Sequence, residues 1–177
     1  MIRTLLIANR GEIARRIIRT ARAMGIRTVA VYAEPDATSP HVGEADCAVA
    51  LGGRSPTESY LDVSKLIAAA HRCGADAVHP GYGFVSERAD AAQAIVDAGL
   101  IWVGPPPEVI AALGNKVRAK ELMSGAGVPL LPGATVAEGS DSEAWLDAAA
   151  GVGYPLLVKA AAGGGGRGMR LVEEAAS

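Results

Sequence analysis

Short apolar runs alternate with longer amphipathic stretches over the first part of the chain. The runs at 4–9, 27–32, 76–80 and 100–104 are predominantly apolar and bounded by turn residues, which predicts buried strands. Strands of this kind that alternate with helices are typical of a parallel sheet covered on both faces. We therefore expect an open, Rossmann-like α/β domain over residues 1–104.

Three helices are predicted between these strands. The first has an apolar face opposite an arginine-rich face; its apolar positions are Ile13, Ala14, Ile17, Ile18, Ala21 and Met24, and its arginines are Arg15, Arg16, Arg19 and Arg22. The second is predicted over 55–73, because Ser55, Pro56 and Glu58 have the spacing of an N-cap, a first-turn proline and a capping-box glutamate. The third is predicted over 86–98.

The pattern changes in the second part of the chain. Residues 105–130 are predicted to form a hinge of two short helices. Residues 131–177 contain two strand-like runs, 153–161 and 169–172, joined by a glycine-rich loop. Because two strands alone are only marginally stable in water, we expect the chain to stop inside a second domain and to be a fragment.

Composition and charge exclude several classes of function. The chain is 50% hydrophobic and 20% charged, so it can bury a core and is not intrinsically disordered. Its net charge of −2 gives no signal for nucleic acid or a membrane surface. The first apolar run is too short for a signal peptide or a membrane span. Cys47 and Cys73 have no metal-ligand spacing, and we expect them to be reduced, buried thiols of a cytoplasmic protein.

The glycine-rich loop is the first candidate for binding chemistry. The stretch "KAAAGGGGRGM" over residues 159–169 is not a Walker loop, because Met169 and Arg170 follow Gly168 where that motif needs lysine and a helix. We favour a flap whose backbone amides close over phosphate groups, with Arg167 adding charge. A purely structural turn is the alternative.

Two lysines are further candidates for binding phosphate groups. Lys159 lies in an apolar run, where burial of its ammonium group would require an anionic partner, although on a strand it could instead face solvent. Lys116 lies in the first turn of a predicted helix, where the helix dipole disfavours a cation unless an anion is shared with that helix end. By itself the position of Lys116 favours a structural role over a functional one.

The stretch "HPGYGFVSE" over residues 79–87 is the second candidate. It follows the third strand, and open α/β sheets bind ligands at the carboxyl ends of their strands. Tyr82 and Phe84 stand between glycines and could line a pocket; the alternatives are a tight loop with Phe84 in the core and a half-buried His79 with its hydrogen bonds satisfied. The first strand is followed by one glycine, Gly11, and not by a dinucleotide fingerprint, which disfavours a nicotinamide-binding domain.

Five stretches, "IANRGEIARRIIR", "HPGYGFVSE", "GNK", "GVP" and "VKAAAGGGGRGM", resemble in order and spacing the N-terminal part of biotin carboxylase. This is the ATP-grasp component of acetyl-, propionyl- and other acyl-CoA carboxylases. The resemblance implies that 1–104 is the biotin carboxylase N-terminal domain, 105–130 its helical hinge, and 131–177 the start of the ATP-grasp lid subdomain. It also implies a reaction of Mg-ATP and bicarbonate that forms carboxyphosphate and carboxylates biotin.

The resemblance carries over to individual residues. It implies ATP binding by Lys116, Lys159, Gly163, Gly164, Gly165, Gly166, Arg167, Gly168 and Met169. It implies a biotin-side pocket at His79, Gly81, Tyr82 and Gly83, and a homodimer contact at Arg16 and Arg19. The family's magnesium ligands and catalytic residues are expected beyond Ser177, so we expect no catalytic or metal-binding residue within this chain and no carboxylase activity from it alone.

The implied partners are a biotin carboxyl carrier domain, a carboxyltransferase subunit and a second copy of the chain, with no nucleic acid and no membrane. The resemblance implies that another subunit selects the acyl-CoA substrate, so this sequence does not identify it. Ala161 and Ala162 stand where the family often has serine or glycine, and Asn115 stands where aspartate or serine is common. Alternative interpretations are the N-terminal part of a pyruvate or urea carboxylase, or a non-catalytic module for nucleotide binding or dimerisation.

Overall fold

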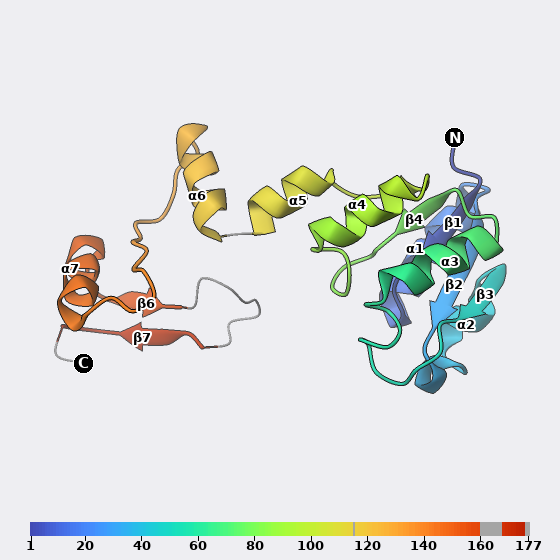
Figure 1. The fold of residues 1–177 in the computed structure, drawn as a ribbon, viewed down its shortest axis with the longest axis horizontal. Helices are drawn as coiled ribbons and strands as arrows, with labels where there is room; N and C mark the ends of the chain where they lie inside the picture. The colour runs from blue at the N-terminus through green and yellow to red at the C-terminus, as the bar shows by residue number, and fades with distance from the viewer. Residues whose placement is uncertain (115, 160–167, 176–177) are drawn as a thin grey trace. The chain divides into compact units, whose positions relative to one another are not determined.

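The computed structural model describes residues 1–114, 116–159 and 168–175 (Figure 1). The chain divides into two compact units, Met1–Ala111 and Ala112–Ser177. Four glycines of the predicted flap, Gly163, Gly164, Gly165 and Gly166, lie outside the described residues, as do Arg167, Ala161, Ala162 and Asn115.

A five-stranded sheet forms the centre of the first unit. Its strands are β1 (Thr4–Ile7), β2 (Arg27–Tyr32), β3 (Cys47–Ala50), β4 (Ala77–His79) and β5 (Ile101–Trp102). They lie in the order β3-β2-β1-β4-β5 and every neighbouring pair is parallel. The predicted open parallel sheet is therefore confirmed, with β1 at its centre.

Helices cover both faces of this sheet (Figure 1). They are α1 (Gly11–Ala23), α2 (Pro40–Glu44), α3 (Val63–Arg72) and α4 (Ala89–Asp97), with a short 3₁₀ helix at Glu34–Asp36. Along β1, Leu5 and Ile7 belong to the core that contains the apolar face of α1. Leu6 points the other way, into the core that contains Leu66 of α3 and Ile95 of α4. Side chains that alternate along β1 thus pack into both cores, and the unit has three layers: helices, the sheet, and helices on its other face.

Several sequence-based boundaries in this unit were wrong. The second helix begins at Val63 and not at 55, because the Asp62 carboxylate caps it by accepting from the Lys65 backbone N–H at 3.1 Å. Ser55 and Glu58 do make capping-box hydrogen bonds, but within a turn. Met24 ends α1 and is 68% exposed, so it is not part of the apolar face. The elements between β2 and α3, including β3, were not predicted.

The second unit has little internal packing among its described residues. Its elements are α6 (Lys116–Gly125), α7 (Ser142–Val152), β6 (Leu156–Val158) and β7 (Arg170–Val172), and α5 (Pro107–Gly114) spans the division between the units. The two predicted hinge helices and the hairpin are confirmed, with β6 and β7 antiparallel, whereas α7 was not predicted. No described residue from 112 onward is fully buried. Within the described part of the chain, no helix is both long and apolar enough to cross a membrane.

Candidate functional site

A pocket of about 360 Å³ lies where β1 and β4 end side by side in the sheet. It is lined by Asn9, Arg10, Gly11, Glu12, Ile13, Tyr82, Gly83 and Phe84. Because β1 and β4 run parallel, the segments that follow them leave the same edge of the sheet. This is the edge at which open α/β sheets bind ligands. The pocket brings Tyr82 and Gly83, two of the predicted biotin-side residues, together with the turn that opens α1.

Asn9 connects the two segments of the pocket. Its side chain is 3% exposed, and its amide Nδ2 donates hydrogen bonds of 2.7 Å to the carbonyl oxygens of Pro80 and Tyr82. Its Oδ1 accepts from the backbone N–H of Arg10 at 2.9 Å. Gly81 has a φ of +67°, and a Cβ at this position would lie 2.8 Å from the Asn9 amide nitrogen. The close approach of Asn9 therefore requires glycine at position 81.

Tyr82 presents its side chain to the pocket opening. The residue is 60% exposed, and its hydroxyl donates a hydrogen bond to Oε1 of Glu12, at the start of α1. This hydrogen bond to a carboxylate raises the pKa of Tyr82 above its ordinary value. The hydroxyl is therefore protonated at neutral pH. An exposed phenol with a fixed direction can contact a planar ligand, and its oxygen, whose proton is donated to Glu12, can accept a hydrogen bond from that ligand.

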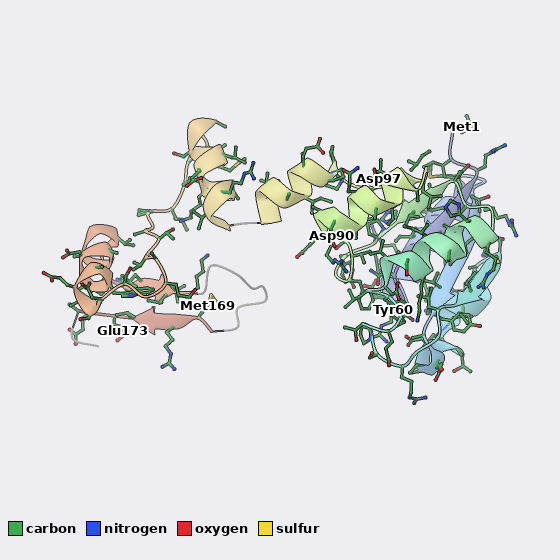
Figure 2. The ribbon with its side chains drawn as sticks, viewed as in Figure 1. Met1, Tyr60, Asp90, Asp97, Met169 and Glu173 are labelled. Carbon is green, nitrogen blue, oxygen red and sulfur yellow. The ribbon has the colours of Figure 1, made fainter. Side chains whose placement is uncertain are left out.

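Behind the pocket, an aromatic and charged cluster holds Arg10 and Phe84 in place. The rings of Tyr60 (labelled in Figure 2) and Phe84 stack with centroids 4.9 Å apart. The Arg10 guanidinium lies 5.6 Å from the Tyr60 ring centroid and 5.7 Å from that of Phe84. Phe84 also packs against the core on this face of the sheet. Phe84 thus packs against the core, as in the structural alternative, and also lines the pocket.

Asp36 closes this cluster on the polar side. Its Oδ2 accepts from the Tyr60 hydroxyl at 2.6 Å and from Nη1 of Arg10 at 2.9 Å. Partial burial acts to raise the pKa of Asp36, but these hydrogen bonds outweigh it, so the pKa lies below its ordinary value. The Tyr60 hydroxyl also accepts from the buried backbone N–H of Ala33 at 3.0 Å. Burial raises the pKa of Tyr60 well above its usual range, and its phenol is therefore a permanent structural hydrogen-bond donor.

His79 stabilises the first turn of the loop that follows β4 through a hydrogen bond to its imidazole ring. The half-buried imidazole accepts from the backbone N–H of Gly81 at 3.0 Å through Nδ1. Burial lowers the pKa of His79 below its ordinary value. The neutral ring is the form that accepts this hydrogen bond, since a protonated Nδ1 has no free lone pair.

The stability of the first unit should therefore decrease in mild acid. The folded-state pKa of His79 is lower than the unfolded value of about 6.5, so the unfolded state binds more protons between the two values. The stabilisation is fully present above the unfolded value and is lost as the pH falls below it. Urea unfolding at a series of pH values from about 5 to 7.5 measures this.

His79→Gln should remove this part of the pH dependence, because its amide does not titrate in that range. His71→Gln is the matched control, because His71 is exposed in the last turn of α3. If the free energy of unfolding changed with pH in the same way in the wild type and in H79Q, His79 would not be the source of this pH dependence.

The predicted nucleotide-side residues lie in the second unit. Val158 pairs with Arg170 across the β6–β7 hairpin, which places exposed Lys159 and Met169 (labelled in Figure 2) at the next position of the hairpin. Gly168 has a φ of +74°, a conformation that favours glycine. Lys116 opens α6, and its side chain is outside the described part of the chain. The hairpin therefore brings together two of the predicted ATP-side residues.

The remaining predicted residues are placed as follows. Arg16 and Arg19 are exposed on the polar face of α1. Across residues 1–114, 116–159 and 168–175, no three His, Cys, Asp or Glu side chains gather in a way that could hold a metal ion.

Sequence reasoning missed four residues that organise the pocket: Asn9, Glu12, Asp36 and Tyr60. One signal was available, since Asn9 directly follows an uncharged apolar run and a buried amide at a strand end needs hydrogen-bond partners. The partners of Glu12, Asp36 and Tyr60 are distant in sequence and could not be identified from spacing.

Two family models match the chain. The model of the biotin carboxylase N-terminal domain matches residues 1–110, and that of the ATP binding domain of the carbamoyl-phosphate synthase L chain matches residues 115–177. Together they cover both units.

Curated relatives share about half of their aligned residues with this chain. The biotin-dependent acyl-coenzyme A carboxylase alpha3 subunit of Mycobacterium leprae is 52% identical over 96% of this chain and 28% of its own length. The biotin carboxylase of Halalkalibacterium halodurans is 51% identical over 97% of this chain and 38% of its own length. A putative urea carboxylase of Emericella nidulans is 51% identical over 95% of this chain and 13% of its own length. The chain thus spans well under half the length of these relatives.

Solved structures show the same likeness. The biotin carboxylase domain dimer of Hydrogenobacter thermophilus 2-oxoglutarate carboxylase, in complex with MgADP, ADP and bicarbonate, is 43% identical with a TM-score of 0.90. The match covers 99% of this chain and 38% of the Hydrogenobacter thermophilus chain. A biotin carboxylase–β,γ-ATP complex from Campylobacter jejuni is 42% identical with a TM-score of 0.92. This match covers 99% of this chain and 39% of the Campylobacter jejuni chain.

Proposed function

This chain belongs to the biotin carboxylase family, and we propose from that membership that the whole protein is an ATP-dependent ligase that carboxylates biotin. The proposal rests above all on the likeness over nearly the whole chain to a biotin carboxylase domain in complex with MgADP and bicarbonate. In the proposed reaction, ATP activates bicarbonate as carboxyphosphate, and biotin on a carrier domain accepts the carboxyl group. We further propose that residues 1–104, 105–130 and 131–177 are the N-terminal domain, the hinge and the start of the ATP-grasp lid.

The chain's own residues have positioning and binding roles in this proposal. Tyr82 and Gly83 face biotin from the pocket, and Gly81 and His79 fix the shape of the loop that carries them. The Tyr82 hydroxyl donates its proton to Glu12, which sets its direction, and its oxygen can accept a hydrogen bond from biotin. The pocket has a volume of about 360 Å³, and the two hydrogen bonds donated by Asn9 tie its two backbone segments together.

On the nucleotide side, we propose that Lys159 and Lys116 neutralise phosphate oxygens. Gly163, Gly164, Gly165, Gly166, Arg167, Gly168 and Met169 would form the lid of this site. ATP supplies the energy and the phosphoryl group of the reaction. The exposed ammonium of Lys159 beside the hairpin loop supports this assignment, because it is available to an anionic ligand without a burial penalty. Magnesium enters the proposal through the relatives alone.

The proposed partners are a biotin carboxyl carrier domain, a carboxyltransferase subunit and a second copy of the chain. The exposed Arg16 and Arg19 on α1 are the proposed homodimer contact, and the Hydrogenobacter thermophilus domain to which the chain is similar is a dimer. A cytoplasmic location also stays a prediction. The urea carboxylase relative favours one alternative, in which the same N-terminal part serves a different carboxyl acceptor.

A hybrid enzyme tests the proposed function. Residues 1–177 replace the matched stretch of the Halalkalibacterium halodurans biotin carboxylase, which is 51% identical and supplies the rest of the fold. We expect ATP hydrolysis that depends on both bicarbonate and biotin, at a rate within about tenfold of the parent enzyme, because single contacts at the junction are each worth about 1 kcal/mol. A folded hybrid whose ATP hydrolysis ignores biotin would contradict the proposal and favour a non-catalytic module.

A further inference from the structure

The two cysteines, which are 26 residues apart in sequence, meet at the amino-terminal edge of the sheet. Cys47 begins the edge strand β3, and Cys73 follows the last residue of α3, just before β4. Their Sγ atoms lie 3.0 Å apart. The two cysteines are half-buried, whereas the sequence predicted buried thiols. A disulfide bond is about 2.05 Å long, so the two sulfur atoms need to approach by only about 1 Å to form one.

Secondary structure holds the backbone on both sides of this sulfur contact. Cys47 pairs with Val29 in the β2–β3 ladder. The backbone N–H of Cys73 donates to the carbonyl of Ala69 at 3.2 Å at the end of α3. Both side chains pack against the same core on one face of the sheet. The two thiols are therefore held together by the fold, and their high effective concentration favours a bond between them over a bond to a dissolved thiol.

We propose that Cys47 and Cys73 form a reversible dithiol–disulfide site, oxidised by low-molecular-weight disulfides and reduced by low-molecular-weight thiols. The site lies at the amino-terminal ends of the strands, whereas the pocket lies at their carboxyl ends. It is thus a modification site separate from the proposed carboxylase function, and either can fail without the other.

The oxidation proceeds by two thiol–disulfide exchanges. The thiolate of one cysteine attacks a sulfur of the small disulfide RSSR, whose S–S bond breaks to give a mixed disulfide and RS⁻. The second cysteine, as thiolate, attacks the protein-side sulfur of the mixed disulfide, forms the Cys47–Cys73 bond and releases a second RS⁻. Both thiol protons end on the released RSH molecules. The protein loses two electrons and two protons, and one RSSR becomes two RSH.

The pKa of Cys73 affects how fast its thiol can attack a disulfide. Burial, together with the adjacent Cys47 thiol, raises the pKa of the Cys73 thiol. Because the thiolate is the attacking species, exchange at Cys73 is slow at neutral pH and accelerates in mild alkali.

The crosslink should stabilise the first unit. It would join an edge strand to the end of a helix and close a loop between two cysteines that are 26 positions apart in the unfolded chain. For a loop of this length, loop-closure entropy predicts an increase in Tm of roughly 5–15 °C.

The test treats the 177-residue chain with excess oxidised glutathione at about pH 8.5, near the ordinary thiol pKa. We expect a mass loss of about 2 Da without bound glutathione, since two hydrogen atoms leave. Non-reducing peptide mapping should show a Cys47–Cys73 link, Tm should increase, and dithiothreitol should reverse both changes.

Cys47→Ser and Cys73→Ser are the matched controls, with Cys47→Ala as a second variant if a serine hydroxyl prevents folding. Each should take up one glutathione and show no increase in Tm. Four results would overturn the proposal: glutathione bound to both cysteines of the wild type without an internal link, a disulfide between two chains, no reaction, or an internal link that lowers Tm.

Discussion

Asn9→Ala should lower the free energy of unfolding of the first unit by about 2–5 kcal/mol, because it leaves two carbonyl oxygens without a donor. The Asn9 amide donates to Pro80 and Tyr82 at 2.7 Å from a side chain that is only 3% exposed. Water therefore cannot replace these hydrogen bonds unless the loop moves. Asn9→Asp should cost at least as much, since it keeps the size of the side chain but directs a carboxylate at the same two oxygens.

Trp102 provides the measurement. It is a buried residue of the first unit, and in a Trp145→Phe background it is the one remaining tryptophan of the chain. Urea unfolding followed by its fluorescence therefore reports the first unit alone. Gln93→Ala is the matched control, because the Gln93 amide donates to Asp97 on the exposed face of α4. It should cost about 0.5 kcal/mol or less. If Asn9→Ala lowered the free energy of unfolding by as little as Gln93→Ala does, the loop after β4 would not depend on the Asn9 hydrogen bonds.

Lys159→Ala in the hybrid enzyme should raise the KM for ATP about 10–100-fold, the range expected for loss of a charge-assisted hydrogen bond to phosphate. Lys159 follows β6 with an exposed side chain, so removing it is not expected to disturb packing. Lys65→Ala removes the same charge from α3 in the first unit, where the ammonium donates to the Glu58 carbonyl, and should leave the KM unchanged. A folded K159A hybrid with an unchanged KM for ATP would remove Lys159 from the nucleotide site.

The strands buried inside the sheet could be predicted from sequence, and the edge strand β3 could not. β1 and residues 28–31 of β2 are uncharged, mostly apolar and fully buried, so their composition alone distinguishes them. β3 consists of Cys47 to Ala50 at the sheet edge, where only Val49 is fully buried. Alanine has little preference for strands, and hydrogen bonding to β2 is what makes this segment a strand.

The start of α3 shows why a local motif can mislead. Ser55 and Glu58 make the hydrogen bonds of a capping box, yet the chain turns and does not enter a helix there. The reason is a distant contact: Tyr60 is buried, stacks on Phe84 and donates to Asp36 at 2.6 Å. Burial of one aromatic ring in this position outweighs a cap worth about 1 kcal/mol.

The location of the pocket was predictable, but its construction was not. The position of "HPGYGF" after an apolar strand indicated a loop at the carboxyl edge of a parallel sheet. The partner of that loop is the end of β1, and β4 lies beside β1 although two strands intervene in sequence. The hydrogen bonds from Asn9 across this junction therefore depend on strand order, which periodicity does not encode.

The most direct test of the central claim is the KM for biotin of the hybrid enzyme carrying Tyr82→Ala. If the pocket at the ends of β1 and β4 faces biotin, loss of the exposed phenol should raise this KM about 10–100-fold and leave the KM for ATP within about twofold. Tyr82→Phe, which removes only the hydroxyl that bonds to Glu12, should have a smaller effect on the same constant. An unchanged KM for biotin in a folded Y82A hybrid, or an equal rise in both constants, would contradict the account.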